Sequence, residues 1–439
     1  MGKTYRAYLP EQKLLLPPSL QDWLPENHLA YFVSDVVDQL DLSAIESVYE
    51  KEWRGQPPYH PRLMVKLLVY GYCRGVRSSR KIAQRLVEDV PFRVLAAGNQ
   101  PDFRTISDFR KIHLEALEGL FQQVLRIALE AGALQLGRVA LDGTKMKANA
   151  SKHKAMSYGR MKQAEQQLEA EVKKMLAEAE AVDAEEDARY GAEKQGRELP
   201  AELQRRQTRL QKIRQAQQAL EQRAQQQAAA AGQPDEQARE AQPRDKEQYN
   251  FSDPESRIMK GGDGFLQAYN AQAAVEGSTQ LIVGQRVTQA ANDKEQLLPL
   301  LEAVEQQSGQ RPEEVLADSG YCSEKNLESV EAPEKPEQKI DAYIATNRQK
   351  HGRRAGPAPR GRIPRAATRV ERMQRKLRTK AGAKIYAQRK GIVEPIFGQI
   401  KQARGIRQFL LRGFKKVQGE WALVCLTHNI LKMHTLCYG

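Results

Sequence analysis

The stretch Gly137–Ser151 reads GRVALDGTKMKANAS, and its first half decides the fold class. The apolar run after Gly137 predicts a buried strand that ends at Asp142. VLADSG (residues 315–320) repeats the pattern, with Asp318 in the equivalent place. An acid at the carboxyl end of a buried strand points out of the sheet edge, where open α/β sheets place their sites. If the two strands are neighbours, we expect the two aspartates to lie close together.

Periodicity predicts the rest of an α/β core. A strand hairpin is expected around Glu276-Gly277, and a helix from about Asp293. DAYIATNRQ (341–349) predicts another short strand, and the C-terminal part, which carries Glu394, is helical. We assign the first part of the core to residues 134–156 and the remainder to 249–439, with a basic linker at 350–370.

The N-terminal part divides into two segments. Residues 1–60 are rich in proline and predict an irregular arm. Residues 61–133 have helical periodicity and predict an all-α domain. Its arginines fit a DNA-reading helix-turn-helix domain if they are exposed; they are Arg74, Arg77, Arg80, Arg104 and Arg110. A helical packing domain with solvated arginines explains them equally well, and both interpretations stay open.

Residues 157–248 interrupt the core. They are rich in Gln, Ala, Glu and Arg, and apolar residues recur on alternating three- and four-residue steps in two runs. Gly191, Gly196 and Pro200 separate the runs. This pattern predicts two long helices folded into an antiparallel hairpin with a thin apolar seam. The hairpin is therefore an insertion between the first and second core strands.

Positive charge is concentrated in one region. The chain has a net charge of +14, yet residues 350–416 hold 21 Lys or Arg and only two acids, Glu371 and Glu394, for a net charge of +19. A basic surface confined to one region indicates a polyanion partner, with nucleic acid as the first candidate. A solvated basic tail is the alternative, but the apolar residues interleaved through 385–414 favour a binding surface.

Several protein classes are not expected. No apolar run approaches the ~18 residues of a membrane span, and the N-terminal sequence lacks the features of a signal peptide. The four cysteines form no C-x-x-C pair. We expect them to be buried, reduced thiols, with neither a disulfide framework nor a zinc site. We therefore expect a cytoplasmic protein that has no contact with a membrane.

The carboxylates predict a metal site. Asp142 and Asp318 repel each other if they are neighbours, so the pair needs a cation. Oxygen ligands without a His or Cys cluster favour Mg²⁺ over zinc. A third carboxylate from a helix, Glu394, completes a site for two ions about 3.5–4 Å apart. The simpler alternatives are turn residues for the aspartates and a surface ion pair with Lys390 for the glutamate.

Glu394 lies in KIYAQRKGIVEPIFGQIKQARGIRQ (384–408), and Pro395 follows it directly. A proline inside a helix clashes with the residue four positions back, which here is Gly391. We expect either a kink at Pro395 or a helix that starts there. The apolar residues around Glu394 are expected to pack this helix on the sheet, and the surrounding Arg and Lys residues are expected to bind phosphates.

At these residues the chain resembles bacterial insertion-sequence transposases of the DDE class, whose catalytic core is RNase H-like (retroviral-integrase-like). The matching stretches cover most of the chain from about residue 60; they are LDGTKMKANASKHKAMSYGRM (141–161), YNAQAAVE (269–276), VTQAANDKEQL (287–297), VLADSGYCSEKNL (315–327), DAYIATNRQKHG (341–352), 376–413 and EWALVCLTHNILKM (420–433). The resemblance implies a mixed five-stranded sheet with flanking helices, preceded by the all-α domain and interrupted by the hairpin.

The resemblance also implies residue roles. Asp142, Asp318 and Glu394 would be the catalytic, metal-binding triad, with two Mg²⁺ ions for which Mn²⁺ substitutes. Related transposases carry a Tyr–Arg–Glu–Lys signature around the glutamate, which Tyr386, Glu394 and Lys401 fit. For the basic position, Arg389 has the right distance from Tyr386, and Lys390 has the right distance from Glu394. The expected DNA contacts are Tyr386, Arg389, Lys390, Lys401, Arg404 and Arg407.

The implied activity is metal-dependent cleavage of DNA at the terminal inverted repeats of an insertion sequence, followed by transesterification into target DNA. The expected partners are double-stranded DNA, as element ends and target, and a second copy of the chain on that DNA. The expected location is the bacterial cytoplasm, at the nucleoid. Two alternatives stay open: a structure-selective nuclease on the same fold without strand transfer, and a non-enzymatic DNA-binding protein derived from a transposase.

Overall fold

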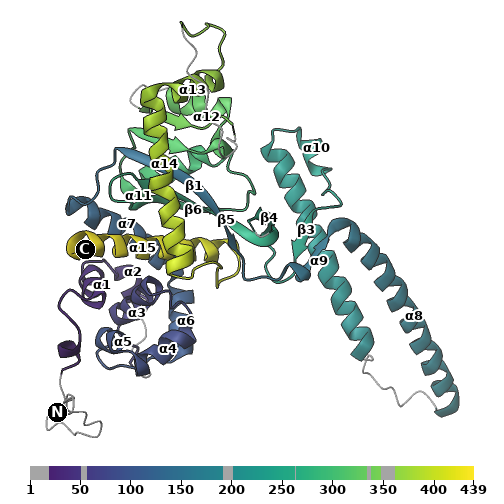
Figure 1. The fold of residues 1–439 in the computed structure, drawn as a ribbon. Helices are drawn as coiled ribbons and strands as arrows, with labels where there is room; N and C mark the ends of the chain where they lie inside the picture. Colours follow the sequence, from purple (N-terminus) through teal and green to yellow (C-terminus); the bar gives the residue numbers. More distant parts are fainter. Residues whose placement is uncertain (1–18, 51–56, 191–200, 263, 334–337, 348–360) are drawn as a thin grey trace, which may run out of the picture.

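The computed structural model describes residues 19–50, 57–190, 201–262, 264–333, 338–347 and 361–439. The predicted hairpin turn (191–200), much of the predicted basic linker (348–360) and parts of the predicted arm (1–18 and 51–56) lie outside the described residues. Figure 1 shows three parts: a twisted sheet with flanking helices, a bundle of N-terminal helices, and a long helical hairpin that projects away from both.

The central sheet has the RNase H-like arrangement that the sequence predicted. Its core strands lie in the spatial order β6-β5-β1-β7-β8. Strand β1 is antiparallel to β5 and parallel to β7. A sixth strand, β4, pairs with the start of β5 and was not predicted. The strands are β1 (Arg138–Lys147), β4 (Arg257–Gly261), β5 (Gly264–Glu276), β6 (Ile282–Thr288), β7 (Glu314–Ala317) and β8 (Asp341–Ile344).

Strand β1 does not end at Asp142, as the sequence predicted, but continues to Lys147. The parallel pairing with β7 stops at Leu141 opposite Ala317. The antiparallel pairing with β5 goes on as far as Lys147 opposite Ala268, and it satisfies the backbone of the polar second half of the strand. Asp142 therefore lies inside β1, at the point where β7 ends.

Five helices complete the core: α11 (Leu297–Ser308), α12 (Glu324–Glu331), α13 (Arg369–Arg378), α14 (Lys380–Gly398) and α15 (Phe414–Tyr438). In Figure 1, α14 crosses the sheet, and α15 lies between the sheet and the N-terminal helices. Trp421 of α15 is fully buried, and its indole N–H donates to the carbonyl of Gln272 in β5 at 3.0 Å. Helix α15 thus links the sheet to the helical part of the chain.

Pro395 lies inside α14, so the helix does not start there as one expectation held. A proline has no N–H and leaves the carbonyl four residues back without its helical donor. Here that carbonyl, on Gly391, accepts a hydrogen bond from Nε2 of Gln280 at 2.8 Å. Gln280 lies in the turn between β5 and β6. A π-helical turn, Gln399–Ala403, follows the α-helix.

The N-terminal helices start earlier than residue 61. Helices α1 (Leu29–Asp38) and α2 (Ser43–Glu46) lie in the stretch predicted to be an irregular arm. The others are α3 (Pro61–Cys73), α4 (Ser79–Glu88), α5 (Val90–Leu95), α6 (Phe103–Ile112) and α7 (Leu114–Glu130). Their buried side chains form one continuous hydrophobic core with those of the sheet and α15. The helical part therefore packs as one body with the core.

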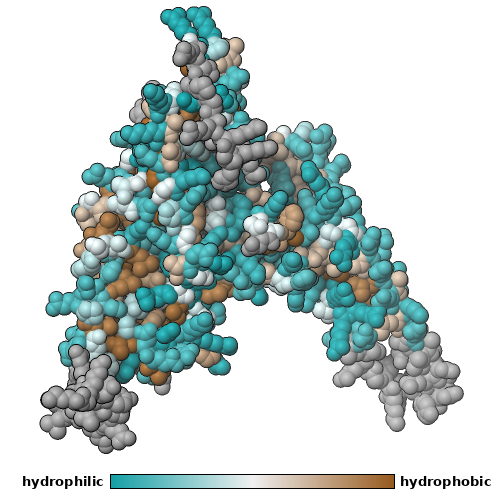
Figure 2. Space-filling model, viewed as in Figure 1, coloured by the Kyte–Doolittle hydropathy of each residue, from teal (hydrophilic) through white to brown (hydrophobic). Residues whose placement is uncertain are grey.

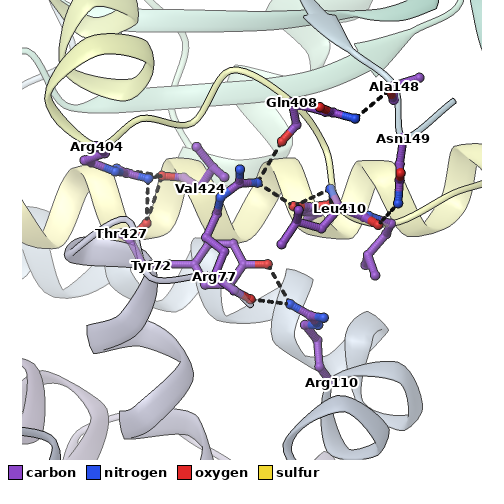
Figure 3. Close-up of polar contacts among 12 residues, drawn as sticks. Tyr72, Arg77, Arg110, Ala148, Asn149, Arg404, Gln408, Leu410, Val424 and Thr427 are labelled. Atoms are coloured by element: carbon purple, nitrogen blue, oxygen red, sulfur yellow. Dashed lines mark hydrogen bonds and ion pairs between the residues drawn. The ribbon is translucent and has the colours of Figure 1, made fainter. Parts of the chain in front are cut away.

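A buried polar network joins the helical part to the core (Figure 3). Arg77 donates to the carbonyl of Gln408 at 2.8 Å and pairs with Glu420 of α15 at 2.9 Å. Glu420 is fully buried and also accepts hydrogen bonds from the backbone N–H groups of Leu410 and Leu411. Arg110 donates to the carbonyl of Arg77 at 2.9 Å.

This network corrects part of the predicted set of exposed arginines. Arg77 and Arg110 are buried and structural, so they are unavailable to DNA. Arg74, Arg80 and Arg104 are exposed as predicted. The tight contact also explains Gly75, which has φ +73°: a Cβ there would lie 2.3 Å from the carbonyl oxygen of Arg404.

The insertion folds as the predicted hairpin. Strands β2 (Ala155–Ser157) and β3 (Gln248–Asn250) pair at its base. Helices α8 (Tyr158–Tyr190) and α9 (Ala201–Ala230) form its arms, and a short helix α10 (Asp235–Arg239) follows. The predicted apolar seam is present as a separate small core, which includes Met161, Leu168, Leu210, Ile213 and Leu220. The hairpin therefore has its own hydrophobic core.

Two sequence expectations concern composition. All four cysteines are free; Cys73 and Cys425 are buried as predicted, whereas Cys322 is half-buried and Cys437 is exposed. Within the described ranges, none of the helices combines the length and the apolar character that a membrane span requires.

The Arg77–Glu420 pair yields a stability prediction. We expect Arg77→Ala to lower the free energy of unfolding by about 3–5 kcal/mol, because it leaves a buried carboxylate without its counter-charge. Arg74→Ala, which removes an exposed arginine from the same turn, is the matched control and should change stability by less than about 0.5 kcal/mol. Denaturant-induced unfolding measures both variants, and equal midpoints would contradict the proposed role of the pair.

Candidate active site

Asp142 and Asp318 lie side by side at the end of the parallel pairing. Because Leu141 is opposite Ala317, the next residues of the two strands are the two aspartates. Oδ1 of Asp142 accepts a hydrogen bond from the N–H of Gly143 at 2.8 Å, and Oδ1 of Asp318 accepts one from the N–H of Gly320 at 2.8 Å. The expected proximity of the two acids is confirmed by this register.

Burial dominates the electrostatics of Asp142. It raises the pKa of this carboxyl from 3.8 to about 6. The charge of Arg389 lowers the pKa, whereas the charges of Asp318 and Asp293 raise it. Only 22% of the Asp142 side chain is exposed, so water screens these charges weakly. Asp142 is therefore partly shielded from water, and its ionisation costs free energy unless a cation lies nearby.

A third aspartate, Asp293, belongs to this site and was not predicted. Its Oδ1 accepts hydrogen bonds from Nδ2 of Asn270 at 2.6 Å and Nε2 of Gln272 at 2.7 Å, and it lies 3.5 Å from Nζ of Lys145. Asp293 lies in the loop before α11, so the pattern of an acid after a buried strand does not identify it. Its stretch, 287–297, matched the resemblance, but nothing in the sequence distinguished this residue.

Gly143 makes room for this arrangement. A Cβ at this position would lie 2.2 Å from Nε2 of Gln272 and 2.8 Å from Oδ1 of Asp293. The small residue after Asp142 is therefore required by the close approach of the β5 amides and the Asp293 carboxylate, rather than by a turn.

Glu394 lies near the aspartate pair but is not in contact with it. Nη1 of Arg389 lies 3.6 Å from Oδ2 of Asp142, and Nη2 of the same guanidinium lies 4.0 Å from Oε1 of Glu394. The Glu394 side chain is 56% exposed. Arg389 is buried, and its Nε and Nη1 atoms have no hydrogen-bond partner among the described residues. The guanidinium thus lies between the two acids as their shared counter-charge.

The donor set fits a divalent cation in part. Asp142 and Asp318 offer adjacent hard oxygen donors, and burial together with repulsion makes their joint ionisation costly without a cation. In the described part of the chain, no three His, Cys, Asp or Glu side chains gather closely enough to bind one ion together. The structure therefore brings two of the three predicted ligands together and leaves Glu394 beyond Arg389.

A basic groove of about 1040 Å³ begins beside the carboxylates. It is formed by the end of β1, the start of the insertion, the β4–β5 turn and the segment after α14. Seven Lys or Arg residues line it, and none of the described residues that line it is an Asp or Glu; the seven are Lys145, Lys147, Lys152, Lys154, Lys401, Arg407 and Arg412. Such a surface is suited to a polyanion.

The predicted DNA contacts fall into different environments. Lys401 and Arg407 line the basic groove, and Nζ of Lys401 donates to the hydroxyl of Thr144. Lys390 is exposed and Tyr386 is half-buried, and burial raises the pKa of Tyr386. Arg404 is buried, and its guanidinium donates to the carbonyl of Val424 at 3.2 Å (Figure 3). Arg404 therefore has a structural role and is unavailable to DNA.

The raised pKa of Asp142 predicts how stability depends on pH. The folded chain binds this proton more tightly than the unfolded chain, so ionisation destabilises the fold as the pH rises from about 4 to about 6. In the presence of EDTA, we expect Asp142→Asn to raise the free energy of unfolding at pH 7 by up to about 3 kcal/mol, and to have little effect at pH 4. Thermal unfolding at both pH values measures this, and the same change at both would contradict it.

Two family models match separate parts of the chain. One, described as a transposase domain (DUF772), matches residues 18–112, and the other, described as a transposase DDE domain, matches residues 235–430. The second match includes Asp318 and Glu394 and begins after Asp142. No curated protein and no solved structure gives a significant match. The chain belongs to the insertion-sequence transposases of the DDE class, enzymes that act on DNA and generally use divalent metal ions.

Proposed function

We propose that this transposase binds the terminal inverted repeats of its insertion sequence, cleaves a DNA strand at each end, and joins the freed 3′-OH to target DNA by transesterification. The observation that carries the proposal is the register of β1 with β7, which sets Asp142 beside Asp318 in an RNase H-like sheet. The basic groove beside this pair supports a nucleic-acid substrate. Neither feature alone distinguishes the reaction, but together they combine a cation site with a phosphate-binding surface.

Asp142 and Asp318 would hold divalent cations, Mg²⁺ or in its place Mn²⁺, with Glu394 as the third carboxylate. When bound, such ions lower the pKa of the attacking hydroxyl and stabilise the charge on the attacking and leaving oxygens. Asp293 would orient neighbouring side chains of the site: its carboxylate accepts hydrogen bonds from the amides of Asn270 and Gln272 and lies near Lys145. We propose it as a positioning residue of this site.

Arg389 is the proposed phosphate contact next to the scissile bond. Its Nε and Nη1 atoms have no hydrogen-bond partner among the described residues, and a planar guanidinium is able to bind two phosphate oxygens at once. Its place between Asp142 and Glu394 favours it over the exposed Lys390 for this role. Tyr386, Lys401 and Arg407 remain proposed contacts, with the two cations located on the wall of the basic groove.

The N-terminal helices are the proposed reader of the element ends. Arg80 and Arg104 are exposed and stack against the ring of Phe103, at 5.2 and 5.8 Å from its centroid. An exposed aromatic ring with two guanidinium groups offers both charge and a stacking surface to DNA. Because transposition joins two ends in one reaction, we also propose a homodimer on DNA.

Cleavage of DNA that carries the ends of the element tests the proposed site. We expect cutting with Mg²⁺ or Mn²⁺ and none with EDTA. We expect Asp142→Asn and Glu394→Gln each to bind DNA but to cut more than about 100-fold more slowly, because each removes a metal-binding oxygen. Glu371→Gln, which neutralises the other acid of the basic region, is the matched control and should cut normally.

The outcomes separate the alternatives. Normal cutting by Glu394→Gln would make Glu394 a surface ion-pair residue. Cutting by the wild type without joined product in a strand-transfer assay would support the nuclease. Binding without metal-dependent cutting by the wild type would support the DNA-binding protein.

A further inference from the structure

A second pocket, of about 690 Å³, continues the basic groove toward the inserted hairpin. The two share the lining residues His153, Lys154 and Ser252. The far wall of the second pocket is helix α9, through Arg209, Lys212 and Ile213. The groove, which reaches the carboxylates through Lys145, therefore extends onto the insertion, to which neither the fold nor the site described above gives a function.

The charges of the hairpin are divided between an internal and an external face. Arg206 and Arg214 of α9 pair with acids of α8: Arg206 with Glu171, and Arg214 with Glu165 and Glu169. Arg209 and Lys212 are exposed, and no carboxylate of the described residues pairs with either. The ion pairs between the helices thus involve Arg206 and Arg214, and leave Arg209 and Lys212 available on the wall of the pocket.

These cations of α9 lie on one face of the helix. Arg205, Arg209 and Lys212 are four and three residues apart, which places them on one face of the helix. The hairpin holds this face rigidly, because its apolar seam packs the two helices and Tyr158 donates to Glu221 at 2.6 Å. Helix α9 has 30 residues, which corresponds to a length of about 45 Å or about 13 base pairs of duplex DNA.

The charge of the second pocket indicates which kind of molecule binds there. None of the described residues that line the second pocket is an Asp or Glu, and its cations are Lys154, Arg209 and Lys212. The same surface of a second copy would bring like charges together, whereas a duplex supplies a phosphate for each cation and releases counterions on binding. The pocket also includes the partly exposed rings of Tyr249 and Phe251 at its base.

We propose that helix α9 of the insertion is the far wall of a DNA channel, and that the duplex cut at the carboxylates extends along the basic groove and across Arg209 and Lys212. This inference rests on the proposed function and deepens it, because it assigns the hairpin to DNA binding. Figure 2 agrees with this in one respect: hydrophilic side chains cover most of the visible hairpin, and no broad apolar face appears on it.

The test removes the two cations and measures affinity as a function of salt. The double variant Arg209→Ala/Lys212→Ala is compared with Lys173→Ala/Lys174→Ala, which removes the same charge from exposed positions of α8 outside both pockets. With a duplex of about 60 base pairs that carries an element end, the α9 variant should bind more weakly, and its slope of log K against log salt should fall by about 2. The α8 control should match the wild type.

Duplexes shortened stepwise from either side of the cleavage site locate the contact. The difference between the α9 variant and the wild type should disappear once the duplex ends before it reaches the hairpin. Circular dichroism checks that both variants fold, which is expected because all four positions are exposed.

Each outcome has a distinct meaning. If the wild type binds and cuts DNA but the α9 variant has the same salt slope on every duplex, this inference is overturned and the proposed function stands. If the α9 variant instead changes the oligomeric state in sedimentation experiments at unchanged DNA affinity, the surface is a protein interface and the inference is again overturned. If the wild type neither binds nor cuts DNA, the proposed function fails as well.

Discussion

The buried contact of Arg77 with Glu420 holds the parts of this protein together. Glu420 neutralises the guanidinium and also accepts the backbone N–H groups of Leu410 and Leu411, so one carboxylate fixes both the helical part and the segment after α14. That segment in turn pairs with the end of β1: Asn149 donates to the carbonyl of Leu410, and Gln408 donates to the carbonyl of Ala148. A wall of the basic groove therefore depends on this buried charge pair, because Arg77 also donates to the carbonyl of Gln408, which lines the groove.

The candidate site combines charge with partial burial. Asp142 and Asp318 are forced together by strand register, and burial raises the pKa of Asp142 to about 6. An arrangement of this kind costs stability and is retained where a function needs it. Arg389 offsets part of the repulsion, but its Nε and Nη1 atoms make no hydrogen bond to any residue that the structure describes. A site that is only partly neutralised by its own residues is suited to receive both cations and phosphates.

The inserted hairpin adds a second basic surface next to the one formed by the sheet. An RNase H-like sheet alone offers one edge to a substrate, whereas the DNA channel that we propose has the hairpin as a second wall. Its own small core and the ion pairs between α8 and α9 stabilise the packing of the two helices against each other. Arg206 and Arg214 of α9 are paired with α8, whereas Arg209 and Lys212 lie on the exposed face of the helix.

The sequence by itself predicted the core strands other than β4, the hairpin, and an acid at or after two buried apolar runs, because helical periodicity and an apolar run followed by an acid are local signals. That Asp142 lies beside Asp318 was decided by the pairing of β1 with β7, which joins strands distant in the chain. Local signals did not reveal that β1 continues past Asp142, since its polar half is held by pairing with β5. They also did not show which arginines are buried: Arg77, Arg110 and Arg404 look like their exposed neighbours in the sequence and differ only in long-range partners. Asp293 and the partner of the Gly391 carbonyl were decided by tertiary structure for the same reason, because each depends on residues distant in the chain that only folding brings into contact.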